Sequence, residues 1–483
     1  MSLVDLALGV LCLELGLLTR LSLLRLFVYT FPYVGGNLLY NTLVPVKIGR
    51  VAGFAIIALA FSGLVRSGGG MSVIKEKAGR LLLVTTMITL AGLFWALWSS
   101  DSLPLWNQEP LERASRSTVR QITFWLIPIG FSILIRNAEE CRTLMRDGLI
   151  AGGIYSALGL LQFGVGITTG TDIFPITRVA GDYLTFQSMI GLDGHGRVTS
   201  ICGEPRYFSS FLTMWLVFAV MCGPKAGLRS WQVSALSLLF LAVNALTASR
   251  SGLAQLLLIL LSILVLSFVR RNRGMLREAV QISVFVLVTV TGVLCFGDLT
   301  VKGRIAFVDE APGNRFTVAG YSFPMEYQDG QVLRLMVTNP AFLVAGFGAG
   351  LWQYATNPYD NLGYRQTYFS AGVLAIDSMR PNISGLGLLT DFGLFGVWLT
   401  VRVYKQCVRV AGSAGSEALR RQFMPAVTVL LIATFAAATT DTYCNVMLFV
   451  VLALWRYTAD ARGVPAMQVL APGRDSPEHR LGP

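Results

Sequence analysis

Charged side chains are scarce in this sequence: they make up 14% of its 483 residues, against about a quarter in a typical soluble domain. Hydrophobic residues account for 54%, the mean hydropathy is +0.60, and the apolar residues come in long runs. This composition excludes a soluble enzyme, a secreted disulfide scaffold and a disordered regulator. It predicts a polytopic membrane protein and leaves transport and membrane-embedded catalysis open. The net charge of +12 then mostly sets orientation, and no nucleic-acid partner is expected.

The residues of metal and disulfide chemistry are also few. The chain has two histidines, His195 and His479, and seven cysteines, no two of which stand at C-x-x-C spacing. A His-rich metal site is excluded, and neither a zinc site nor a disulfide framework is expected. Residues 1–19 are apolar, lack a basic leader and contain Asp5 and Glu14. We therefore expect a retained span there rather than a cleaved signal peptide.

Long apolar runs predict an all-α protein with membrane-spanning helices, each of which needs about 20 residues to cross the hydrocarbon core. Region 1–45 contributes one or two spans, broken by Pro32 and by Gly35-Gly36, and the expected total is 12 or 13. The other predicted spans are 48–65, 80–98, 122–136, 147–166, 207–223, 232–248, 251–269, 279–296, 383–404, 421–439 and 443–458.

Lys and Arg gather in four short loops, which predicts that these loops are cytoplasmic. They are 66–80, 136–146, 270–277 and 402–421. Three longer loops fall on the opposite side, at 99–121, 167–206 and 297–382. The transmembrane domain, with the 297–382 loop, is expected to cover 1–458. Residues 459–483, rich in Pro, Gly and charge, are expected to form a disordered cytoplasmic tail.

The string Thr247-Ala-Ser-Arg-Ser-Gly252 lies where one predicted span ends and the next begins. Arg250 therefore falls in the first turn of a helix whose N-terminus faces the outer side. The free N–H groups and the positive dipole end of such a helix favour an anion, and a planar guanidinium suits phosphate oxygens. The alternative is an arginine that snorkels to the lipid–water interface and has no ligand.

The long outer loop, 297–382, carries further candidates. It contains Arg315, and then Arg334 in an amphipathic stretch that predicts a short helix on the membrane, ended at Pro340. The glycines of Gly346-Phe-Gly-Ala-Gly350 would let the backbone pass close to another group. They are not a nucleotide-binding fingerprint, because no strand precedes them. A loop of this length is more typical of a functional segment than of a spacer.

Two further strings put polar residues at the outer surface. In Arg197-Val-Thr-Ser-Ile-Cys-Gly-Glu-Pro-Arg206, the carboxylate of Glu204 stands between two arginines, as a general base or as an ion-pair partner. In Met379-Arg-Pro-Asn-Ile-Ser384, Arg380 precedes Asn382, an expected cap of the returning span.

Taken together, these motifs resemble the superfamily of O-antigen ligases and Wzy-type O-antigen polymerases, which includes some O-linked oligosaccharyltransferases. The resemblance covers roughly residues 190–460. The matching elements are Thr247-Ala-Ser-Arg250, the Arg334 helix with Asn339-Pro340 and Gly346-Phe-Gly348, and Asn382 followed by Gly393-Leu-Phe-Gly396.

The resemblance implies a GT-C-like glycosyltransferase of the bacterial inner membrane, with its active site at the periplasmic face and no metal or cofactor. Its donor would be a glycan on undecaprenyl pyrophosphate, held by Arg250 and Arg334. Arg197, Arg206, Arg315, Arg380 and Asn382 are the expected substrate-binding residues. Glu204 is the candidate base, with Asp377 second. Membrane lipids and a chain-length regulator protein are the expected partners.

One departure from the family pattern separates polymerases from ligases. Ligases of this superfamily resemble each other in a His just before the Asn at the end of the large loop, where this chain has Pro381. Gly203-Glu-Pro205 instead looks like the E-P motif of many polysaccharide polymerases. We therefore expect a polymerase, with a ligase as the alternative. A lipid-linked sugar flippase is the rival from another class, and it would leave the outer-loop motifs unexplained.

Overall fold

The computed structural model describes eleven stretches of the chain and several isolated positions. The stretches are 19–32, 48–66, 138–169, 198–202, 205–223, 226–247, 249–270, 315–318, 321–324, 328–348 and 389–395. They are helical, as expected, except for turns and one antiparallel hairpin in the predicted outer loop. The hairpin pairs β1 (Arg315–Val318) with β2 (Tyr321–Pro324).

Five helices coincide with predicted spans. They are α3 (Ile48–Arg66), α7 (Ala138–Thr169), α8 (Pro205–Cys222), α9 (Ser230–Leu246) and α10 (Arg250–Arg270). In region 1–45, α2 (Arg20–Thr30) ends just before Pro32. Phe31 keeps helical backbone angles and its N–H donates to the carbonyl of Phe27, whereas Pro32 has no N–H to continue the helix. The predicted spans 421–439 and 443–458 and the tail 459–483 lie outside the described residues.

Within the described part of the chain, one helix, Glu139–Thr169, is long and apolar enough to cross a membrane, judged by length and composition. Four shorter apolar helical segments accompany it: Val51–Ala60, Tyr207–Val220, Ser230–Leu246 and Gln255–Val265. The helical character of the predicted spans is thus confirmed where the chain is described, and their number stays a prediction.

The prediction of a loop at 136–146 is wrong from residue 138 onward, since α7 begins at Ala138. Acidic side chains in its first turn, Glu139 and Glu140, interact favourably with the positive end of the helix dipole. Arg142 adds an ion pair to Glu139 at 3.0 Å, three residues apart on the same face. The charges that suggested a loop therefore stabilise the start of a helix.

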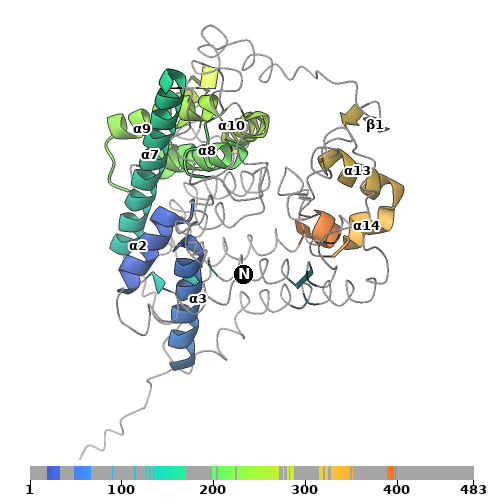
Figure 1. The fold of residues 1–483 in the computed structure, drawn as a ribbon, viewed down its shortest axis with the longest axis horizontal. Helices are drawn as coiled ribbons and strands as arrows, with labels where there is room; N and C mark the ends of the chain where they lie inside the picture. The colour runs from blue at the N-terminus through green and yellow to red at the C-terminus, as the bar shows by residue number, and fades with distance from the viewer. Residues whose placement is uncertain are drawn as a thin grey trace, which may run out of the picture.

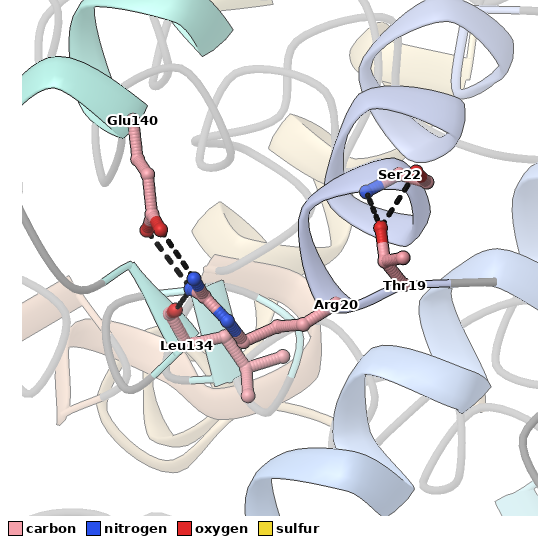
Figure 2. Close-up of polar contacts among 5 residues, drawn as sticks. All are labelled: Thr19, Arg20, Ser22, Leu134 and Glu140. Atoms are coloured by element: carbon pink, nitrogen blue, oxygen red, sulfur yellow. Dashed lines mark hydrogen bonds and ion pairs between the residues drawn. The ribbon is translucent and has the colours of Figure 1, made fainter. Parts of the chain in front are cut away.

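Polar contacts join α2 to α7 along their lengths. At the start of α2, the Arg20 guanidinium donates to both carboxylate oxygens of Glu140 and to the carbonyl of Leu134 (Figure 2). Near its end, the Tyr155 hydroxyl donates to the carbonyl of Tyr29 at 2.9 Å. Later residues of α2 contact later residues of α7. The two helices therefore run parallel, and they begin on the same side of the packed group.

Between these two contacts, Arg25 and Tyr29 of α2 bind the buried side chain of Asp147 in α7. The Nε of Arg25 donates to Asp147 at 2.6 Å, and the Tyr29 hydroxyl donates to the same carboxylate at 3.2 Å. The Asp147 side chain is 2% exposed, whereas that of Arg25 is 47% exposed. At this deeply buried position, the guanidinium and the hydroxyl take the place of the water that would otherwise bind the carboxylate.

The core lies where α7 packs against α2, between Glu140 and Tyr155, and against α8 and α9, between Gly148 and Gly159 (Figure 1). Trp215 of α8 is fully buried there. A Cβ added to Gly148 would lie 2.3 Å from the Trp215 ring, and one added to Gly152 would lie 3.2 Å from it. The two glycines of α7 therefore make room for the indole, which draws α7 and α8 together.

Two short helices form a second packed group within residues 328–345. They are α13 (Gln328–Thr338) and α14 (Pro340–Ala345). Pro340, predicted to end the first helix, is also the first residue of the second, where a missing N–H costs nothing.

Candidate functional site

Residues 198–202 form a tight turn that leads toward α8. The N–H of Cys202 donates to the carbonyl of Thr199 at 3.1 Å and closes the turn. The N–H of Val198 donates to the carbonyl of Leu246, the last residue of α9, at 3.2 Å. The turn therefore lies against the junction between α9 and α10.

Ser200, the third residue of this turn, has a φ of +51°. Glycine normally occupies such a position, and other residues there carry about 1–3 kcal/mol of strain. The Ser200 hydroxyl donates to the carbonyl of Tyr155 in α7 at 2.8 Å, and its N–H donates to the side chain of Gln162 at 2.8 Å. Glycine could not make the first of these contacts, which accounts for a serine in a glycine position.

Two helices begin beside this turn. Pro205 opens α8, with Arg206 directly after it. Arg250 opens α10, and the hydroxyl of Ser249 caps this helix by accepting the N–H of Gly252 at 3.2 Å. The prediction that Arg250 lies in the first turn of a helix is confirmed, and Arg206 has the same position in α8.

The starts of α8 and α10 are held together by close packing. A Cβ added to Gly252 would lie 1.5 Å from Oγ and 2.6 Å from Cβ of Ser209 in α8. The Ser209 hydroxyl donates to Asn244 of α9 at 2.6 Å, and Asn244 donates to the Thr213 hydroxyl at 2.8 Å. We call the 198–202 turn and the first turns of α8 and α10 the helix-end site. Two helix N-termini side by side favour a bound anion.

Gly252→Ala should test this contact. The added methyl overlaps Ser209, so the variant is expected to lose about 1–3 kcal/mol of stability, as overpacked sites do. The matched control is Gly164→Ala in α7, where an added Cβ meets no atom within 4 Å and should leave stability unchanged or slightly raised. Thermal unfolding of both variants in detergent measures the difference. Equal stability of the two would contradict the close approach of α8 and α10.

Arg334 lies on the exposed face of α13. On the opposite face, Val332 and Met336 are buried together with Phe347. The ring of Phe347 also stacks on that of Phe342 in α14, with centroids 4.0 Å apart. The predicted short helix around Arg334 is thus confirmed, and its apolar side packs against the loop that follows α14.

The glycine string after α14 approaches another backbone, as predicted. Gly346 and Gly348 have φ values of +76° and +91°. The N–H groups of Phe347 and Gly348 donate to the carbonyls of Thr390 and Asp391, at 2.7 and 3.1 Å. A Cβ added to Gly346 would lie 2.7 Å from the Asp391 carbonyl oxygen. The glycines therefore dock the loop onto the start of the helical segment 389–395.

Arg250 and Arg334 belong to two separately packed groups. Figure 1 shows α13 and α14 on one side of the view and the helices α7 to α10 on the other. Their hydrophobic clusters are also distinct. That Arg250 and Arg334 bind the same pyrophosphate therefore stays a prediction.

The other predicted site residues are described in part or not at all. Arg315 is the first residue of β1 and pairs with Pro324 of β2. Outside the described residues lie Arg197, Glu204, Asp377, Arg380 and Asn382. Arg197 directly precedes the 198–202 turn in the sequence, and Glu204 directly precedes α8. The backbone that flanks both of them is therefore part of the helix-end site.

The 198–202 turn of the helix-end site ends at Cys202. Among the described residues, no three His, Cys, Asp or Glu side chains come together as metal ligands would. Complete burial raises the pKa of the Cys202 thiol well above its ordinary value. Cys202 therefore remains a protonated thiol, which is neither a good nucleophile nor a metal ligand.

Gln162 and Asn244 were missed by the sequence reasoning. Both are buried, and both form the hydrogen bonds that position the helix-end site. The available signal was an amide side chain inside a predicted apolar span, since a buried amide requires partners.

No protein-family model matches the chain, and no curated protein matches it significantly.

Proposed function

We propose that this protein is a polytopic glycosyltransferase of the bacterial inner membrane. It would polymerise oligosaccharide repeat units, carried on undecaprenyl pyrophosphate, into O-antigen or another surface polysaccharide at the periplasmic face. The observation that carries the proposal is the joint start of α8 and α10 at the helix-end site, because Arg206 lies in the first turn of α8 and Arg250 opens α10. The motif resemblance supplies the substrate class.

The distribution of side chains supports a membrane environment for α7 to α10. Polar side chains are buried between the helices: Asp147, Ser156, Gln162, Ser209, Thr213 and Asn244. Large apolar side chains are exposed on the outside: Ile150, Ile154, Leu161, Trp231, Leu261, Val265 and Phe268. Water would favour the reverse arrangement, whereas lipid accepts apolar side chains and excludes polar ones.

The chemistry of the proposed donor suits the helix-end site. When the hydroxyl of the acceptor sugar attacks the anomeric carbon of the donor, a C–O bond forms and the bond to the pyrophosphate oxygen breaks. Undecaprenyl pyrophosphate leaves with the electron pair, and its growing negative charge is stabilised by arginines and helix N–H groups. The hydroxyl proton passes to a carboxylate, for which Glu204 is the first candidate and Asp377 the second.

Purified protein in lipid nanodiscs, supplied only with repeat units on undecaprenyl pyrophosphate, tests the proposal. Chains longer than one repeat are expected without added nucleotide or metal, and one undecaprenyl pyrophosphate should be released per added repeat. Gel analysis of the glycans and mass spectrometry of the lipid measure both. The control is the same preparation with Arg250→Ala, which should leave single repeats.

A deletion strain separates polymerase from ligase. A polymerase joins repeats, so its loss should leave single repeats on undecaprenyl pyrophosphate or on the final acceptor. Long chains that accumulate on the lipid carrier would instead assign the protein as a ligase. Transfer of unextended repeats across a vesicle bilayer would identify a flippase and exclude both enzymes.

A further inference from the structure

We propose that Gln162 is a positioning residue for the helix-end site. It would act by holding the 198–202 turn, and through the turn the segment that runs into α8. The inference rests on the proposed function, because it assigns Gln162 a role in the turnover of that site.

Gln162 makes an unusually complete set of contacts with the turn. Its side chain is fully buried in α7. Its Oε1 accepts the N–H of Thr199 at 3.0 Å and that of Ser200 at 2.8 Å, and its Nε2 donates to the Thr199 hydroxyl at 3.1 Å. One side chain thus satisfies two successive backbone N–H groups that would otherwise be buried without partners.

These contacts concern the strained residue of the turn. Ser200 has a positive φ, and such a conformation persists only where its surroundings determine it. Without Gln162, the two N–H groups need other partners, and the turn can relax toward an unstrained φ. Three residues separate Ser200 from Glu204 along the chain. A change of backbone angles in the turn is therefore expected to displace Glu204, the candidate base. Arg250 belongs to α10, whose start is also held by the close approach of Gly252 to Ser209 of α8.

Four variants of the full-length protein separate positioning from folding. Gln162→Leu removes all three hydrogen bonds at nearly constant volume. Gln162→Glu keeps the shape of the side chain, and its carboxyl, neutral at a fully buried position without a cation, can accept both N–H groups with one oxygen and donate to the Thr199 hydroxyl with the other. Thr199→Val removes only the hydroxyl. Ser156→Ala is the matched control, because Ser156 is equally buried in α7 and, among the described residues, its hydroxyl donates to the carbonyl of Gly152 in its own helix.

Turnover of lipid-linked repeats and binding of undecaprenyl pyrophosphate alone are measured for each variant. Gln162→Leu is expected to lose at least 20-fold in turnover while its affinity for undecaprenyl pyrophosphate stays within twofold of wild type. Gln162→Glu should remain within fivefold of wild-type turnover, and Thr199→Val should lose about fivefold. Amide hydrogen exchange at Thr199 and Ser200 should be at least tenfold faster in Gln162→Leu and unchanged in Ser156→Ala.

The outcomes distinguish the two proposals. Wild-type protein that extends no chains removes the proposed function. Active wild-type protein with Gln162→Leu within threefold of Ser156→Ala removes the role of Gln162 alone. A loss of undecaprenyl pyrophosphate binding that matches the loss of turnover, or Gln162→Glu as inactive as Gln162→Leu, also overturns it. Should Gln162→Leu fail to insert, Thr199→Val decides, and turnover equal to that of Ser156→Ala refutes the proposal.

Discussion

Arg250→Ala is expected to lower chain extension by about 30-fold to 900-fold while the protein stays folded and inserted. The loss corresponds to about 2–4 kcal/mol for one group that stabilises charge in the transition state. Arg250→Lys should be impaired as well, because an ammonium cannot make the bidentate contact of a guanidinium with a phosphate. Arg334→Ala should lose activity to a similar extent if both arginines hold the same pyrophosphate.

The measurement is the rate of polymer formation from lipid-linked repeats, normalised to inserted protein. Arg142→Ala is the control, because Arg142 lies at the start of α7, is half exposed and pairs with an exposed Glu139. Such a surface pair contributes at most about 1 kcal/mol, and its loss should leave activity unchanged. Wild-type polymer length in Arg250→Ala or in Arg334→Ala would remove that arginine from the site.

Arg25→Leu is expected to destabilise the protein by about 3 kcal/mol. The substitution leaves the buried carboxylate of Asp147 with the Tyr29 hydroxyl but without its cation, and an uncompensated buried charge is strongly unfavourable. The double variant Arg25→Leu/Asp147→Leu should regain most of the lost stability, since it removes the charge together with its partner. Non-additivity of this kind is the signature of a direct interaction.

Thermal or denaturant unfolding in detergent, followed by loss of the folded peak in size-exclusion chromatography, measures these differences. Arg142→Ala again supplies the control, with an expected change below about 1 kcal/mol. If Arg25→Leu and the double variant are equally unstable, the Arg25–Asp147 pair contributes nothing specific. The parallel packing of α2 on α7 would then rest on its apolar contacts.

The sequence predicts those features whose cause is local. The ends of α9 and α10 and the position of Arg250 follow from hydrophobic length and from cap residues such as Ser249, which act within one turn. The same holds for the break at Pro340 and for the need for glycine at 346. Each depends on residues that are neighbours in the chain.

Features that depend on distant partners could not be predicted in this way. Arg142 and Arg146 predict a basic loop. The sequence does not reveal that Glu140 and Asp147 pair with Arg20 and Arg25, which lie more than a hundred residues away. Nothing in the sequence indicates that the Gln162 side chain accepts hydrogen bonds from the backbone N–H groups of Thr199 and Ser200. The same limit applies to the relation between Arg250 and Arg334, which lie in different packed groups.

Because α2 and α7 run parallel, they limit the number of times that the chain between them can cross a bilayer. Their starts lie on one side, so in a bilayer the chain must cross an even number of times between Arg20 and Ala138. The three predicted spans 48–65, 80–98 and 122–136 make an odd number. One further crossing that begins with α2 would make the number even. A second further crossing between Arg20 and residue 47 would make it odd again. If the predicted spans cross a bilayer, the contact between Arg20 and Glu140 thus decides whether their number between the two helices is even or odd.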